Sequence, residues 1–271
     1  MANQVYDFCD SESFSSIIAS AAQEDTLTYM LEMARCVRTL HDMGIVHRDI
    51  KPANFLFSRK TGKGVLIDFG LCEMDVSAEQ LYPKNNSMKR RLFERISALL
   101  RMVGMNKFGT DGYMPLETIL KSTCQGFAVD VWAAGVIFLQ LQVRKTSIFN
   151  QTNLLCYEKT TGKAQKIGNH FVELIILLAL VFRPKDIEEY CDELGFIVKI
   201  PDDFPANPDN LVKIAGKAEV HPEVWQMTLR MISIRPTDRP TMKDVHYLLR
   251  KVKTETQNLA KNKRKSQELI T

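Results

Sequence analysis

Hydrophobic residues recur at helical spacing in several stretches of the chain. Between Thr26 and Met43 they fall on one face of a helix, with Asp25 or Thr26 as its cap and Gly44 as its end. The apolar positions of this face are Leu27, Met30, Leu31, Ala34, Val37 and Leu40. The same reasoning predicts further helices over residues 88–103, 128–142, 169–181, 184–194, 222–234 and 241–252.

Two short apolar runs follow the first predicted helix. They cover residues 54–57 and 64–69, and the turn-rich sequence SRKTGKG separates them. This pattern is typical of a β-hairpin. The chain is therefore expected to be mainly α-helical, with one small β-hairpin.

The composition is ordinary for a soluble globular protein, with 45% hydrophobic and 25% charged residues. The six cysteines stand singly along the chain, without a CxxC pair or the His/Cys spacing of a zinc site. We therefore expect reduced thiols in an intracellular protein and no disulfide framework.

Neither an export signal nor a membrane span is expected. The first residues, MANQVYDFCDSES, are acidic and lack the apolar stretch of a secretory signal. The most apolar run, residues 171–182, is shorter than the about 20 residues that a spanning helix needs. The net charge of +4 is modest, and we expect neither a membrane nor a nucleic acid as a direct partner.

The residues that carry chemistry lie between the first helix and the hairpin and at the end of the hairpin. His-Arg-Asp-Ile-Lys-Pro-Ala-Asn occupies residues 47–54, and Asp-Phe-Gly occupies residues 68–70. These motifs resemble the catalytic loop and the metal loop of protein kinases. Phosphoryl transfer needs a carboxylate that orients the substrate hydroxyl, which suits Asp49, and oxygen ligands for Mg²⁺, which suits Asn54 and Asp68. ATP and Mg²⁺ are the expected cofactors.

Each motif alone is weak evidence for a kinase. A single His-Arg-Asp is commonly a surface ion pair, and a single Asp-Phe-Gly arises by chance. Three downstream features favour the kinase interpretation. GTDGYMPLE at 109–117, DVWAAG at 130–135 and DRP at 238–240 resemble the family's substrate-binding loop ending in APE, its DxWxxG helix start and its late arginine.

The resemblance implies supporting roles for several residues. Arg239 and Glu117 are expected to form a buried ion pair, so that deleting either strands the other. Asp130 is expected to hold the backbone of the catalytic loop, and His47 to pack rather than to transfer protons. The remaining expected supports are Arg48, Phe69, Gly70 and Thr110.

Lys51 stands two residues after Asp49. In the family this position marks serine/threonine kinases, because its cation offsets charge on the transferring phosphoryl group. Thr110 fits the same class. Serine/threonine specificity is therefore expected rather than tyrosine specificity.

Longer phrases resemble one kinase family in particular. VHRDIKPANFLF, AVDVWAAGVIFLQL and the opening VYDFCDSESF are similar to cell-division-cycle-seven kinases, over residues 5–72 and 108–250. This resemblance implies a nuclear protein kinase that regulates DNA replication initiation and the cell cycle. It also implies protein substrates, among them the minichromosome-maintenance helicase, and an activating regulatory subunit. A casein-kinase-one-like enzyme and a cytoplasmic location are the alternatives.

The front of the chain departs from the family pattern. The sequence contains no glycine-rich GxGxxG loop and no strand lysine paired to a helix glutamate. We interpret residues 1–10 as a hinge remnant of the small lobe, residues 11–252 as a kinase large lobe, and residues 253–271 as a basic, flexible tail. By resemblance, Leu56 forms the floor of the adenine pocket, and the hinge residues that contact adenine are Asp7, Phe8 and Cys9.

Two functions of different classes follow. In the first, the protein is an active kinase whose small lobe precedes Met1, because Asp49, Lys51, Asn54 and Asp68 are all intact. In the second, the chain is complete and acts as a non-catalytic kinase-like binding or scaffold module.

The enlarged activation segment, residues 68–117, contains the predicted basic amphipathic helix 88–103. It is either a docking element for an acidic partner or a helix that packs on its own domain. Residues 151–168 are polar and have no assignment. KNKRK at 261–265 resembles a nuclear-import signal, with a merely solvated tail as the alternative.

Overall fold

The computed structural model describes residues 10–75, 109–120, 126–146, 182–198, 200 and 221–268. Its helices are α1 (Phe14–Ser20), α2 (Gln23–Asp42), α4 (Leu116–Ile119), α5 (Ala128–Val143), α8 (Pro184–Glu193), α10 (Pro222–Met231) and α11 (Met242–Glu268). Its strands are β1 (Ile45–Val46), β2 (Phe55–Ser58), β3 (Lys63–Leu66) and β4 (Glu73–Met74). The described part is therefore helix-rich with few short strands, as expected.

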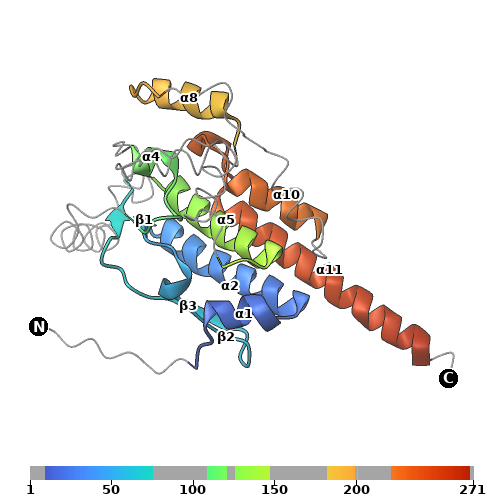
Figure 1. Cartoon of the computed structure of the whole chain (residues 1–271). Coiled ribbons are helices and arrows are strands. Elements are labelled where there is room, and N and C mark those ends of the chain that lie inside the picture. The colour runs from blue at the N-terminus through green and yellow to red at the C-terminus, as the bar shows by residue number, and fades with distance from the viewer. Residues whose placement is uncertain are drawn as a thin grey trace, which may run out of the picture.

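Helix α5 forms the centre of the fold. Every residue from Val129 to Val143 is buried, and a helix that is apolar on all sides needs neighbours around it. Helices α2 and α10 pack against α5, while α11 packs along α2, and Figure 1 shows these four helices side by side. One hydrophobic cluster joins α2, α5 and α11 to the hairpin, and a second joins α5 to α4 and α8.

The predicted hairpin is confirmed as β2 paired antiparallel with β3. Phe55 and Phe57 point inward against Tyr29 of α2, with ring centroids 4.9 Å and 5.0 Å away. Leu56 and Val65 form a cross-strand pair on the outward face. The alternation fixes the register, because a slip of one residue would turn the two phenylalanines to solvent.

A second pair of strands was not predicted. β1 pairs with β4, with Ile45 opposite Met74 and Val46 opposite Glu73. Each strand has only two residues, too few to show a period-2 pattern. The loop that carries Asp49 lies between these two strands in the sequence.

Several helix boundaries differ from the predictions. Helix α2 begins at Gln23 after an Ala22 cap without a side-chain hydrogen bond, so neither Asp25 nor Thr26 caps it. Helix α10 ends at Met231, before the predicted 234. Helices α1 and α4 were not predicted; α1 is short and begins where Ser13 accepts a hydrogen bond from the Ser16 N–H at 3.2 Å.

The tail predicted after residue 252 is helical as far as Glu268, where α11 ends. Residues 253–268 contain neither glycine nor proline and are rich in lysine, glutamate and glutamine, which favour helix. The KNKRK sequence thus forms part of a helix. The predicted helices 88–103 and 169–181 and the segment 151–168 lie outside the described residues, as does the proposed hinge up to residue 9.

Within the described ranges, no helix combines the length and the hydropathy that crossing a bilayer requires.

Candidate active site

Asp130 holds the backbone of the loop between β1 and β2. Its carboxylate accepts hydrogen bonds from the N–H groups of His47 at 2.7 Å and Arg48 at 2.8 Å. Arg48 adopts a left-handed conformation with φ of 63°, which costs a non-glycine residue about 1–3 kcal/mol. Because Asp130 is fully buried in the first turn of α5, its fixed carboxylate stabilises this bend, as the sequence predicted.

His47 joins the same loop to the hairpin. Its buried ring lies 3.2 Å from the Ile67 carbonyl through Nε2, and Nδ1 accepts from the Asp49 N–H at 3.4 Å. The ring also lies 5.3 Å from the ring of Phe69. Both ring nitrogens are therefore engaged with the protein, which agrees with a packing role.

The Asp49 carboxylate is fixed by three side chains. The Thr110 hydroxyl donates to Oδ1 at 2.7 Å, the Lys51 ammonium lies 2.8 Å from Oδ2, and Asn54 Nδ2 donates to Oδ2 at 2.9 Å. Lys51 also donates to Thr110 Oγ1 at 2.9 Å, which closes a triangle around Asp49. The sequence placed these residues on one site, and the structure brings them into direct contact.

Asn54 and Asp68 offer oxygens that suit a hard cation. The side-chain nitrogen of Asn54 donates to the carbonyl and the carboxylate of Asp49. Within the described part of the chain, no group donates to the side-chain oxygen of Asn54. Asp68 is exposed, and one carboxylate oxygen accepts from the Gly70 N–H at 3.2 Å. The Ile67 N–H donates to the Asn54 carbonyl at 3.0 Å, so the hairpin brings the two ends together. Oxygen donors of this kind fit Mg²⁺.

Arg48 connects the catalytic loop to the segment after Asp68. Its Nε donates to the Leu71 carbonyl at 2.8 Å, and its guanidinium forms an ion pair with Glu73 of β4. On the other side, a Cβ at Gly109 would lie 2.7 Å from the Arg48 carbonyl oxygen. Only glycine allows the loop that carries Thr110 to approach this closely.

The predicted pair of Glu117 and Arg239 is confirmed. Its two hydrogen bonds span 2.6 Å and 3.1 Å, and both side chains are buried. The guanidinium also stacks over Trp132, with its central carbon 5.0 Å from the ring centroid. The pair ties α4 to the segment before α11.

Cys72 lies buried beneath the site. Burial raises the pKa of its thiol to about 12, and the negative charge of Asp130 adds to the effect. The thiol is therefore protonated at neutral pH and is a packing group rather than a nucleophile.

Predicted site residues other than Asp68 are also partly or largely exposed, and some residues of the site were not predicted. Leu56 is half-buried on the outward face of β2, and Phe69 is 43% exposed. His41 was not predicted, although its Nε2 lies 3.0 Å from the Asp130 carboxylate. Glu73 was also missed. Their partners lie far away in sequence, so no local motif marks them. The predicted adenine contacts Asp7, Phe8 and Cys9 lie outside the described residues.

Comparison with known proteins finds relatives that match about half of this chain. The cell cycle serine/threonine-protein kinase hsk1 of Schizosaccharomyces pombe is 31% identical over 160 residues, which cover 54% of this chain and 32% of the relative. The cell division cycle 7-related protein kinase of Homo sapiens is 33% identical over 119 residues, 43% of this chain and 20% of the relative. The probable cell division control protein 7 homolog 1 of Encephalitozoon cuniculi is 26% identical over 159 residues, 54% of this chain and 45% of the relative.

The matched region thus covers less than half of each relative. The family model of the protein kinase domain matches residues 2–248, which include the catalytic loop, the hairpin and the Arg239 segment. This chain belongs to the protein kinase domain family.

Proposed function

We propose that this protein is a serine/threonine kinase that transfers the γ-phosphoryl group of ATP to a protein hydroxyl. The observation that carries the proposal is the Asp49 carboxylate, held at once by Lys51, Asn54 and Thr110. A carboxylate oriented by three neighbours is what a hydroxyl nucleophile needs for alignment.

The chain's own residues divide the work as follows. Asp49 orients the substrate hydroxyl and accepts its proton at a carboxylate oxygen. Lys51, 2.8 Å from that carboxylate, offsets negative charge that develops beside it. Asn54 and Asp68 would hold Mg²⁺ through their side-chain oxygens. Magnesium-bound ATP supplies the phosphoryl group when it is present.

The remaining residues keep this geometry. Thr110 comes from the loop that resembles the substrate-binding loop, so its contact with Asp49 couples the acceptor side of the site to the catalytic carboxylate. Asp130 holds the loop from below. Leu56, on the open face of the hairpin, remains our proposal for the adenine floor.

The biological setting is part of the proposal. Similarity to proteins named as cell division cycle 7-related and cell cycle kinases supports a role in cell division. By the family resemblance we extend this to DNA replication initiation, the minichromosome-maintenance helicase as substrate, an activating regulatory subunit and a nuclear location. The alternative is a non-catalytic binding module, motivated by the lack of a GxGxxG loop and a lysine–glutamate pair in this sequence.

A test of the proposal measures phosphoryl transfer to serine, threonine and tyrosine peptides as Mg²⁺ is varied. The chain alone should be compared with the protein that includes any residues encoded upstream of Met1. Transfer to serine and threonine is expected, and Asp68→Asn should raise the Mg²⁺ concentration that half-maximal rate requires. Asp186→Asn, in an exposed ion pair on α8, serves as the control. Transfer by neither protein would favour the binding module.

A further inference from the structure

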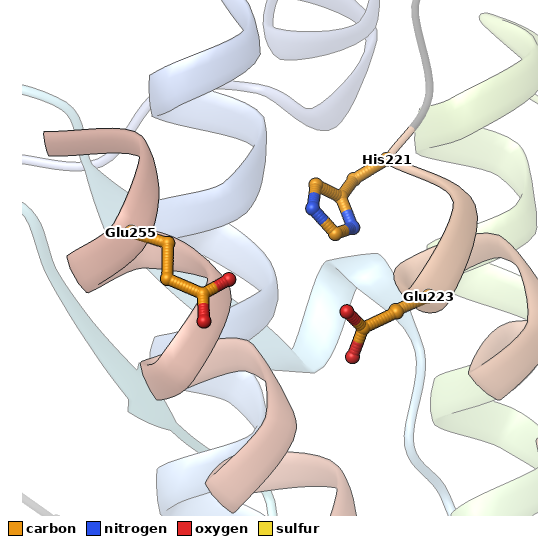
Figure 2. A group of neighbouring side chains, drawn as sticks. All are labelled: His221, Glu223 and Glu255. Atoms are coloured by element: carbon orange, nitrogen blue, oxygen red, sulfur yellow. The ribbon is translucent and has the colours of Figure 1, made fainter. Parts of the chain in front are cut away.

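Three side chains with metal-binding atoms converge where α10 begins beside α11. His221 precedes α10, Glu223 lies in its first turn, and Glu255 comes from α11. Figure 2 shows the imidazole and the two carboxylates turned toward one another. One potential ligand atom from each residue lies within 4.8 Å of the other two. None of these residues belongs to the site around Asp49.

The imidazole of His221 provides an independent sign that this cluster binds a ligand. Its Nδ1 is buried and has no hydrogen-bond partner in the described part of the structure. Leaving a buried polar atom unpaired costs about 1–3 kcal/mol, and native proteins rarely retain such atoms without a partner. A nitrogen lone pair beside two carboxylates is suited to a cation.

The charges of the cluster point the same way. Glu223 forms an ion pair with Lys251 at 3.1 Å, and both side chains are about half exposed. Glu255 forms no ion pair with any residue that the structure describes, so its carboxylate is available to a cation.

We propose that His221, Glu223 and Glu255 bind a divalent transition-metal ion of the zinc class, with water completing its coordination. An imidazole nitrogen with two carboxylate oxygens suits zinc, whereas Mg²⁺ and Ca²⁺ prefer all-oxygen sets. Zinc bonds of about 2.0–2.2 Å in tetrahedral geometry require ligand atoms about 3.4 Å apart. The three ligand atoms lie within 4.8 Å of one another, so they must come closer together to bind zinc. Rotation of the two exposed glutamate side chains allows this.

Such an ion would fasten α11 at the point where it leaves the body of the protein. Val252 is buried, and the described side chains that follow it on α11 are largely exposed. Figure 1 shows the end of α11 projecting beyond the other helices. Glu255 lies about one turn beyond Val252, so the ion would extend the contact between α10 and α11 outward. The proposed ion is structural and independent of phosphoryl transfer.

The test is isothermal titration calorimetry, in which Zn²⁺ is titrated into the 271-residue chain. One saturable site is expected, and His221→Ala and Glu255→Gln should each weaken it at least about tenfold, because even residues that only support a metal ligand cost that much. Lys251→Met should tighten binding, because it removes the competing cation. His246→Ala, which changes a histidine on α11 outside the cluster, should leave it unchanged.

Because Glu255 is exposed, its glutamine variant is expected to fold, and thermal unfolding gives a second readout. Zn²⁺ should raise the Tm of the unaltered chain more than that of Glu255→Gln at the same Zn²⁺ concentration. Zinc affinity that is the same in His221→Ala, Glu255→Gln and the unaltered chain would overturn the proposal. So would the absence of saturable binding in the unaltered chain.

Discussion

Glu117 and Arg239 lie 122 positions apart in the sequence, yet their side chains form a two-pronged ion pair that is 1% and 0% exposed. Arg239 also donates to the carbonyl groups of Ala128, Ser233 and Ile234 at 2.8–3.0 Å. The guanidinium therefore joins α4, the start of α5 and the segment that follows α10. Because both side chains are buried, removing one of them would leave the other as a buried charge without a partner, which is very costly.

Replacing Arg239 by methionine should lower the free energy of unfolding by about 3–5 kcal/mol, because Glu117 is then a buried charge without a partner. Urea denaturation monitored by circular dichroism measures this. Glu193→Gln breaks an exposed ion pair with Arg235 and should leave the unfolding midpoint almost unchanged. If Arg239→Met lowered the free energy of unfolding no more than Glu193→Gln does, this would contradict a stabilising role for the buried pair.

Asp130→Asn should loosen the catalytic loop without unfolding the protein. The amide keeps the size of the side chain but has one acceptor oxygen for the N–H groups of His47 and Arg48. Hydrogen exchange at these two amides should accelerate, while amides within α11 keep their protection. Unchanged exchange at both amides would show that the carboxylate does not hold the loop.

Thr110 should matter for transfer through its hydroxyl alone. Thr110→Val keeps the shape but loses the hydrogen bonds with Asp49 and Lys51, and a bond to a charged group contributes about 1.5–3 kcal/mol. The transfer rate should fall roughly tenfold or more by the same principle, while Thr110→Ser should keep most of it. Steady-state kinetics with a serine peptide measures the difference. Equal rates for the two variants would exclude a role for the hydroxyl.

His246 should make the protein less stable in mild acid. Burial lowers its pKa below the ordinary 6.5, and the charges of Arg38, Arg250 and Arg35 lower it further, while Glu32 opposes them. Well above pH 6.5 the imidazole is neutral in both states and contributes nothing. Below it, the unfolded chain binds the proton first, so stability falls as the pH drops.

His246→Gln should therefore flatten the fall in unfolding free energy between about pH 7.5 and 5.5, a window set by the histidine's titration range. Urea unfolding at several pH values measures the slope. The Arg38 contact at 3.3 Å is lost in this variant, so the slope is diagnostic and the absolute stability is not. Identical slopes for the two proteins would contradict the assignment.

Much of the fold could be predicted from local patterns. The apolar face of α2 and the continuous apolar sequence of α5 are long enough to reveal their helices, and SRKTGKG marks the hairpin turn. The order of the kinase motifs located the site, and the family resemblance gave the pair of Arg239 and Glu117. These features depend on a few residues close in sequence or on a strong motif.

The rest depends on tertiary contacts. His41 meets Asp130 across 89 positions, and Arg48 meets Glu73 across 25, so neither pair leaves a local signal. Strands β1 and β4 are too short for periodicity. The continuation of α11 to Glu268 was missed because polarity suggested a tail, whereas helix propensity and the absence of glycine and proline decided the outcome.

The proposed phosphoryl transfer depends on Asp49. The assay measures transfer of labelled γ-phosphate from ATP to a helicase-derived serine peptide. It compares Asp49→Asn with the unaltered sequence, in the protein that includes any residues encoded upstream of Met1. A loss of about 10²–10⁴-fold is expected, because asparagine cannot accept the proton. Activity in the unaltered protein that Asp49→Asn leaves unchanged would contradict the account.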